Sequence, residues 1–344
     1  MILSATTARN EGPYLLEWIA WHRMLGVTDF LFYSNDCDDG SDLLLDRLAA
    51  HDVIRHERHR PPPGRSIQWS ALKSAWQHEM RKRADWMLIS DIDEFPVVHA
   101  GAGRFDDLLA ALPQGADAVA LPWRLFGAGG LDEITDAPVT GLLTRSAPEG
   151  LAYPIAATFF KSLVRPAAFS GPGVHRPRHR KDERPLWADG AGRVLPMDVA
   201  CNDKRLSLIG LPPHRALVEM NHYSLRSAQA FLVKSERGLP NRADKAIDLS
   251  YWTERNFNHT PNDAALRRQP ALLDAIAALR ALPGIADLHD ACLRWHQEQA
   301  ARIIATPEGY QLYSRIMLAG DSLVLPAATQ KRLLRLFGQI QRPD

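Results

Sequence analysis

Two aspartates one residue apart stand where an apolar run becomes acidic, in Trp-Met-Leu-Ile-Ser-Asp91-Ile-Asp93-Glu-Phe. Side chains of an extended segment alternate with a period of two, so the carboxylates of Asp91 and Asp93 point to the same side. Hard divalent cations prefer carboxylate oxygens, and Mg²⁺ often completes its coordination with substrate phosphates. The motif therefore predicts a cation site that grips a phosphorylated ligand; a solvated turn or a helix start is the alternative.

A cation held by two aspartates needs further ligands, and His222 is the candidate. It follows the apolar run 216–220, which could return it to the edge of a sheet. Neutral imidazole is a common metal ligand. The chain has 13 histidines, however, so spacing alone does not separate His222 from a surface or core histidine.

Positive charge for a phosphorylated ligand must come from individual residues, because 41 lysines and arginines nearly balance 40 aspartates and glutamates. This balance also argues against a nucleic-acid partner. Arg9 ends the first apolar run, Lys161 lies in a later one, and Lys234 follows His222 on an expected helix. We expect these cations to face phosphate.

The loop 34–41 is too acidic to cradle phosphate, and its carboxylates and amides suit the hydrogen-bond donors of a base or ribose. Asn35, Asp36 and Asp38 are the candidates. The alternative is a strand-to-helix turn capped by Asp39 or Ser41, and both interpretations can hold together.

The elements that must position these residues alternate along the first half of the chain. Hydrophobic periodicity predicts strands at 2–7, 29–34, 53–57 and 86–90, and helices at 13–25, 41–50 and 66–83. This rhythm predicts a mostly parallel sheet with helices on both faces. Ligands bind such sheets at the carboxyl ends of the strands, where loops 9–11, 35–39 and 91–94 all fall. Later strands are expected at 118–123, 159–164 and 217–220, and helices at 227–238, 262–282, 285–304 and 330–340. We expect a catalytic region at 1–240 and a helical region at 241–344.

Other function classes lack their motifs. No Gly-x-Gly-x-x-Gly follows the first strand, and neither a P-loop nor a nucleophile elbow is present. Three scattered cysteines, Cys37, Cys201 and Cys292, suggest a reduced, cytoplasmic protein. No apolar run approaches the roughly 18 to 20 residues that span a bilayer, so any contact with the inner face of a membrane would be peripheral.

Taken together, the motifs resemble family 2-like glycosyltransferases of the GT-A fold, in the bacterial branch akin to family 92. The resemblance covers roughly residues 1–240 and rests on Arg9 to Trp18, His22 to Gly26, Tyr33 to Ser41, Asp91 to Phe95, Trp123 to Gly127, Lys161 to Pro166 with His175, and His222 to Ser224 with Ser227, Lys234 and Gly238.

The resemblance implies a GT-A-like, Rossmann-type α/β sheet with a helical C-terminal extension. It implies Mn²⁺ or Mg²⁺ on Asp91, Asp93 and His222, with Asp93 the direct ligand and Asp91 meeting the ribose or the metal through water. Arg9 stands where the family usually has lysine, which keeps the charge but changes the donor geometry. The residues expected to bind the nucleotide-diphosphate-sugar donor are Arg9, Glu11, Asn35, Asp36, Asp38, Asp91, Lys161 and Lys234.

The expected reaction moves a sugar from this donor to a hydroxyl of a glycan, polysaccharide or lipid-linked acceptor, with inversion. Asp93 serves the leaving group through the metal, and Glu133, Asp132 or Asp182 is the expected base. Two alternatives stay open: a degenerate sugar- or nucleotide-binding partner subunit, and a metal-dependent phosphoesterase. The phosphoesterase would need a denser set of histidines and aspartates, usually enough for two metals.

Overall fold

The computed structural model describes residues 1–60, 66–211, 214–238 and 247–340. Its strands are β1 (Ile2–Ala8), β2 (Asp29–Ser34), β3 (Arg55–Arg58), β4 (Trp86–Ile89), β5 (Glu94–Val98), β6 (Ala118–Leu125), β7 (Arg145–Ser146), β8 (Phe160–Val164), β9 (Phe169–Gly171), β10 (Arg178–His179), β11 (Trp187–Ala188), β12 (Val218–His222) and β13 (Thr260–Pro261). Its α-helices are α1 (Gly12–Met24), α2 (Ser41–Ala50), α3 (Ile67–Gln77), α4 (Glu79–Arg83), α5 (Phe105–Ala110), α6 (Val139–Leu142), α7 (Met197–Ala200), α8 (Ala228–Arg237), α9 (Leu249–Thr253), α10 (Gln269–Arg280), α11 (Ile285–Ile304), α12 (Pro307–Ala319) and α13 (Ala327–Ile340).

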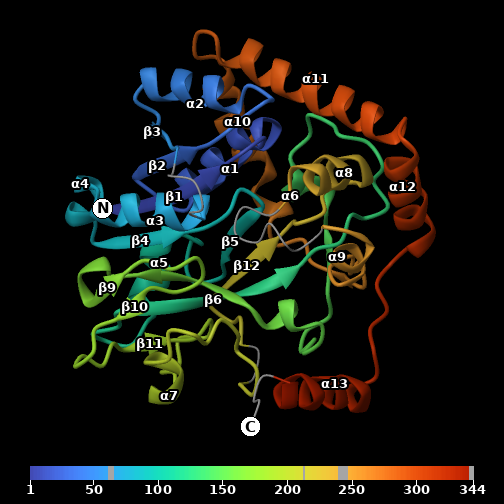
Figure 1. Cartoon of the computed structure of the whole chain (residues 1–344). Coiled ribbons are helices and arrows are strands. Elements are labelled where there is room, and N and C mark those ends of the chain that lie inside the picture. Colours follow the sequence, from blue (N-terminus) through green and yellow to red (C-terminus); the bar gives the residue numbers. More distant parts are fainter. Residues whose placement is uncertain (61–65, 212–213, 239–246, 341–344) are drawn as a thin grey trace.

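A central sheet runs in the order β3-β2-β1-β4-β8-β6-β12-β5, with β11 also pairing with β6 (Figure 1). Strand β1 is parallel to β2 and β4, β2 to β3, and β6 to both β12 and β11. Strand β8 is antiparallel to β4 and β6, and β5 is antiparallel to β12. The predicted α/β class with a mostly parallel sheet is therefore confirmed.

Helices cover both faces of the sheet, and strand alternation decides which residue faces which layer. In β2, Phe30 and Phe32 belong to the core cluster that includes residues of α1, α2, α10 and α11. Leu31 and Tyr33 belong to a second cluster, with residues of α3 on the opposite face. The C-terminal helices thus share a core with the first strands. The predicted boundary near residue 240 lies outside the described residues.

Two predicted helices need correction, and two further elements were not predicted. The helix expected over 66–83 breaks at His78, whose extended backbone separates α3 from α4. The helix expected from 262 begins at Gln269. Strand β5, directly after Asp93, and helix α12 were not predicted, because a strand of five residues that begins in an acidic cluster has no clear period of two.

Within the described part of the chain, no helix combines the length and the apolar character that crossing a membrane requires.

Candidate functional site

The pairing of β5 with β12 brings His222 to the Asp91–Asp93 segment. His222 lies opposite Glu94 in this antiparallel register, and Tyr223 N donates to Asp93 O at 2.8 Å. Strand β12 runs parallel to β6, and both run in the same direction as β4. His222, at the end of β12, therefore lies at the same carboxyl edge of the sheet as the end of β4. His222 Nε2 lies 3.5 Å from Asp93 Oδ1, so two of the predicted metal ligands come together.

Two lysines neutralise the aspartates. Lys234 Nζ on α8 donates to Asp93 Oδ2 at 2.7 Å and to Ser224 O at 2.9 Å. Lys161 Nζ on β8 donates to Asp91 Oδ2 at 2.9 Å and lies 3.2 Å from Glu94 Oε2. The Lys161 side chain is fully buried, and those of Lys234 and Asp93 are nearly so. Both predicted lysines therefore lie at the cation motif.

The carboxyl groups differ in their charge. Burial alone would raise the pKa of Asp93, but Lys234 and His222 hold it well below its usual range. Glu94 is completely buried, and this burial raises its pKa to about 8 even with Lys161 beside it. At neutral pH, two carboxylates, Asp91 and Asp93, therefore balance two ammonium groups. The charges of a divalent cation and of a diphosphate group cancel, so the two binding together would leave the net charge of the site nearly unchanged.

His222 is held in place by packing. Its ring lies 4.1 Å from the Trp123 ring, and its buried Nδ1 has no hydrogen-bond partner among the described residues. Burial lowers its pKa, so the imidazole is kept neutral, the form that binds metals. A second histidine, His175, packs against the same Trp123 ring, with the ring centroids 5.4 Å apart. Burial lowers the pKa of His175 to about 4. Its Nδ1 lies 3.0 Å from Phe160 O.

The loop after β1 is anchored by Arg226, just before α8, and by Arg237 at the end of α8. Glu11 accepts from Arg226 at 2.8 Å and from Arg237 at 2.6 Å, so both carboxylate oxygens are engaged. Arg237 also donates to the backbone oxygen of Arg9. Arg9 itself donates through Nε to Asp36 O at 3.2 Å, which leaves its remaining donors at the rim. Glu11 therefore fixes the loop after β1, whereas the side chain of Arg9 faces outward.

The acidic loop after β2 contains exposed and buried carboxylates. Asp36 and Asp38 are exposed, whereas Asn35 is buried. Asn10 Oδ1 accepts from Asp38 N at 2.8 Å, which ties this loop to the one after β1. Asp39 is buried and accepts from Ser41 N at 2.8 Å, but the N-cap residue of α2 is Gly40, so neither Asp39 nor Ser41 occupies the predicted cap position. Asp38 and Asp36 thus remain the residues available to a base or ribose.

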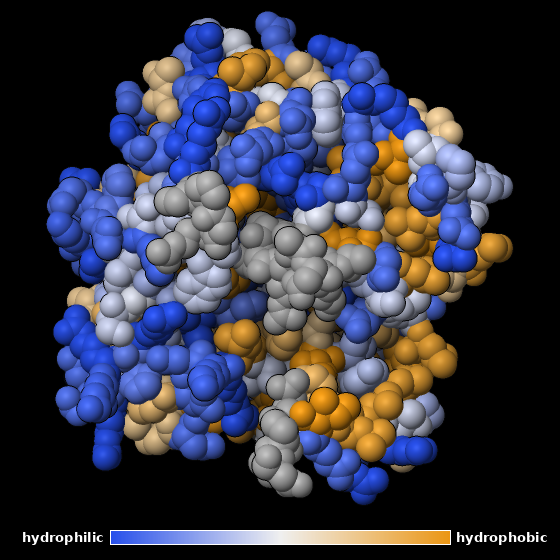
Figure 2. Space-filling model, viewed as in Figure 1, coloured by the Kyte–Doolittle hydropathy of each residue, from blue (hydrophilic) through white to orange (hydrophobic). Residues whose placement is uncertain are grey.

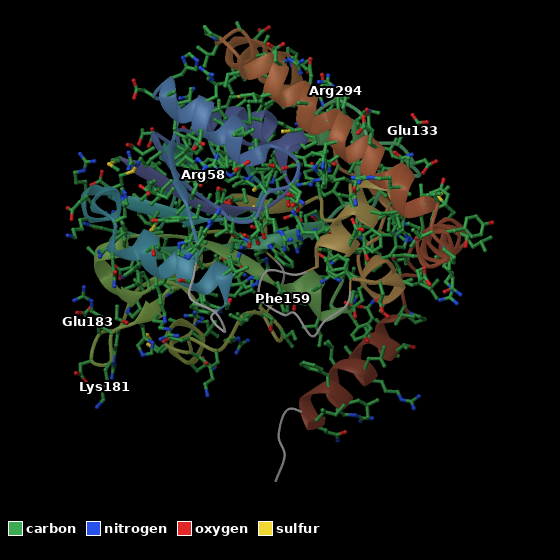
Figure 3. The ribbon with its side chains drawn as sticks, turned by 45° about the horizontal axis from the view of Figure 1, so that its top comes forward. Arg58, Glu133, Phe159, Lys181, Glu183 and Arg294 are labelled. Atoms are coloured by element: carbon green, nitrogen blue, oxygen red, sulfur yellow. The ribbon has the colours of Figure 1, made fainter. Side chains whose placement is uncertain are left out.

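The expected bases lie elsewhere. Glu133 is exposed and lies on the α11–α12 side in Figure 3, far across the view from Lys181 and Glu183, which flank Asp182. Asp132 Oδ2 accepts from Tyr313 at 2.8 Å. No described hydrogen bond or ion pair joins any of the three to Asp91, Asp93 or His222. Their catalytic role stays a prediction.

A second group of possible ligands lies away from this edge. Asp136, His289 and Asp290 place ligand atoms within 4.8 Å of one another. Arg280 already donates to Asp136 at 2.9 Å and to Asp290 at 2.6 Å. Its guanidinium supplies the positive charge that a metal would bring, so this group is a salt-bridge network.

Sequence reasoning missed three contributors. Glu94 belongs to the motif itself but was given no role, although its Oε2 accepts from Asp91 N at 2.8 Å. Gln68 on α3 donates to Asp91 Oδ1 at 3.0 Å. Arg226 stacks on the Tyr14 ring at 3.5 Å and holds Glu11. The signals in the sequence were the place of Glu94 directly after Asp93 and the position of Arg226 four residues after His222; nothing marked Gln68.

The chain is similar to proteins of a known family. The model of glycosyltransferase family 92 matches residues 8–184, slightly more than half of the chain. A family 92 protein of Ricinus communis is 30% identical over 100 residues, which cover 27% of this chain and 16% of that protein. One of Oryza sativa subsp. japonica is 30% identical over 98 residues, covering 26% and 15%. Each of these two alignments spans under a fifth of the length of the relative.

Among solved structures, S. aureus TarS residues 1–349 align with 13% identity and a TM-score of 0.34, covering 90% of this chain and 91% of that one. The mannosyltransferase PcManGT from Pyrobaculum calidifontis, in complex with GDP-Man and Mn²⁺, aligns with 13% identity and a TM-score of 0.33, covering 92% and 84%. A likeness at these TM-scores is too weak to bear on function.

Proposed function

Because the chain belongs to glycosyltransferase family 92, we propose that it transfers a sugar from a nucleotide-diphosphate-sugar donor to a hydroxyl acceptor. The observation that carries this proposal is the convergence of Asp93, His222 and Lys234 at the carboxyl edge of the sheet. The matched residues include the Asp91–Asp93 motif and Lys161, while His222 and Lys234 lie beyond them.

The residues at this edge fit a Mn²⁺ or Mg²⁺ ion. Two ligand atoms about 2.1 Å from a common ion stand about 3.0 to 3.4 Å apart at tetrahedral or octahedral angles. Asp93 Oδ1 and His222 Nε2, at 3.5 Å, are close to this spacing. Asp91 is already engaged by Lys161 and Gln68, which agrees with an indirect role through water or the ribose. When bound, the ion would offset the charge that develops on the diphosphate leaving group.

The protein's own cations support the same chemistry. Lys234 and Lys161 are held at the motif by ion pairs, so no side-chain ordering is needed when an anionic donor binds. Arg9 at the rim adds a further donor for phosphate, and Asp36 and Asp38 accept from a base or ribose. Together these residues orient a nucleotide diphosphate across the ends of β1, β2 and β4.

We further propose that the reaction inverts the configuration of the sugar and uses a glycan, polysaccharide or lipid-linked acceptor, with Glu133, Asp132 or Asp182 as the base. We also propose a cytoplasmic protein, for which the scattered cysteines are the support.

The test is turnover with a panel of nucleotide sugars, with Mn²⁺, with Mg²⁺ and with chelator. We expect Asp93→Asn to lose at least about a hundredfold in kcat/KM, which is the usual cost of removing one group that stabilises a developing charge. Asp106→Asn, an exposed carboxylate on α5, is the matched control and should keep full activity. Circular dichroism of both variants separates lost chemistry from lost folding.

The outcomes distinguish the alternatives. Unchanged turnover in Asp93→Asn would refute the assignment. Tight metal-dependent binding of a donor in calorimetry, without turnover on any acceptor, would favour a degenerate partner subunit. Release of inorganic phosphate from simple phosphate esters would favour a phosphoesterase.

A further inference from the structure

Helix α13 is attached to the body of the protein at one end. Gln330 is buried and accepts from the backbone N–H groups of Ala152 and Tyr153 at 3.0 and 3.1 Å. Its side chain also donates to Leu325 O at 2.7 Å. Figure 1 shows α13 well apart from α10, α11 and α12, at the end of an extended segment. No apolar residue of α13 belongs to the core clusters of the described residues.

The exposed surface of α13 is apolar on one side and basic on the other. Leu336 is 41% exposed, Phe337 38% and Ile340 76%, and helical spacing places them on neighbouring positions of one face. Lys331, Arg332 and Arg335 occupy the opposite arc and are all exposed. Residues 322–340 contain no aspartate or glutamate.

The apolar surface continues beyond α13. Leu318 at the end of α12 is 86% exposed and Leu323 in the connecting segment 76% exposed, with Met317 beside them at 49%. Figure 2 shows hydrophobic residues gathered along the flank that leads from α12 toward α13, on the right of the view. An exposed apolar surface of this extent in a soluble domain marks an interaction site.

The inner side of α13 rests on a hollow. Leu334 lines a small, partly open cavity of about 70 Å³ together with Leu151 and Leu208, and the walls are mostly apolar. The inner side of α13 is therefore not closely packed along its whole length. Its exposed side is available to another surface.

We propose that α13, with the end of α12, docks this protein on the surface of an anionic lipid bilayer. Leu336, Phe337 and Ile340 enter the acyl boundary while Lys331, Arg332 and Arg335 remain among the headgroups, the arrangement of an interfacial helix. A second copy of the chain fits less well, because its residues 322–340 could cover the apolar face but bring no acidic side chain to the three cations. The inference stands apart from the proposed sugar transfer.

The test is co-sedimentation of the full chain with vesicles of phosphatidylcholine, with and without phosphatidylglycerol. We expect binding that needs phosphatidylglycerol and weakens as salt rises. The double variant Lys331→Glu/Arg335→Glu should lower the partition coefficient by at least about tenfold, since each basic residue near an anionic surface contributes about fivefold. Lys73→Glu/Arg83→Glu, the same charge change on exposed positions of α3 and α4, is the control.

A separate experiment tests whether the apolar residues of α13 insert into the bilayer. Phe337→Trp should gain fluorescence that brominated lipids quench, whereas the wild-type signal should change little because most tryptophans of the chain are buried. Equal binding to neutral and anionic vesicles, or an equal loss in the α3/α4 control, would overturn the proposal. Two results together would also overturn it: light scattering that shows a stable dimer, which the double variant Leu336→Ser/Ile340→Ser dissociates, and no binding to vesicles.

Discussion

Replacing Lys234 by methionine removes the charge that balances Asp93 and keeps the aliphatic stem. The ammonium lies 2.7 Å from Asp93 Oδ2, and the two side chains are only 13% and 10% exposed. Breaking one partner of a buried ion pair costs about 3 to 5 kcal/mol, because the other charge is left uncompensated. His222 and Arg226 remain near Asp93 and offset part of this loss. We therefore expect the free energy of unfolding to fall by about 3 kcal/mol, the lower end of that range.

The loss should depend on pH. Burial raises the pKa of Asp93 and Lys234 is the largest influence that lowers it, so this pKa rises in Lys234→Met. A protonated Asp93 needs no partner, so the destabilisation should be greatest at neutral pH and shrink as the pH falls. The wild-type contribution of Asp93, whose folded pKa is depressed, is present above about pH 4 and lost as the pH falls through the folded value.

The assay is urea unfolding without divalent metal, followed by tryptophan fluorescence and far-ultraviolet circular dichroism. Coincidence of the two transitions is required before free energies are compared. The double variant Lys234→Met/Asp93→Asn completes a thermodynamic cycle, and we expect a coupling energy of at least about 2 kcal/mol. Additive losses, or a single-variant loss under about 1 kcal/mol, would mean that the pair is not coupled as the geometry indicates.

Three further perturbations test other parts of the molecule. Gly12→Ala would place a Cβ 2.4 Å from Cys292, so we expect a loss of about 1 to 3 kcal/mol, measured by thermal unfolding, while Gly338→Ala, with nothing within 4 Å, should not destabilise the protein. Glu11→Gln leaves two buried guanidinium groups without a carboxylate, and a drop of about 3 kcal/mol is expected; a change within error would refute the anchoring role. Burial lowers the pKa of His22 to about 3, so the unfolded state binds the extra proton first and stability should fall as the pH drops from about 6.5; His22→Asn should flatten this slope.

The sequence was sufficient for most of the sheet and for its carboxyl edge. Strand β2 has the predicted bounds because its apolar run, Phe30 to Tyr33, lies between polar residues. Helix α11 has them because a period of 3.6 begins directly after Gly284 and ends before Pro307. The same patterns placed the loops after β1, β2 and β4 together, since parallel neighbours must end at one edge. Lys161 and His222 reached that edge as expected, although their roles there are still proposals.

The remaining part of the site depends on tertiary pairing that no local pattern encodes. The register of β5 against β12 decides that His222 lies beside Asp93, and a shift of one residue would turn it to the other face. Glu11 looked like a donor ligand, yet Arg226 and Arg237, more than 200 residues later, engage both its oxygens. Such partners depend on how helix α8 returns to β1, which spacing cannot foretell.

The buried contact between Asp39 and His296 affects the order in which the chain can fold during its synthesis. His296 Nε2 lies 2.9 Å from Asp39 Oδ2, across 257 residues of sequence. The acidic loop after β2 therefore lacks its final support until α11 has been synthesised and has folded back. A contact of such long range forms late in folding, because its loop-closure entropy must be met first. A ribosome that stops before residue 296 would therefore release a chain whose loop after β2 lacks this contact.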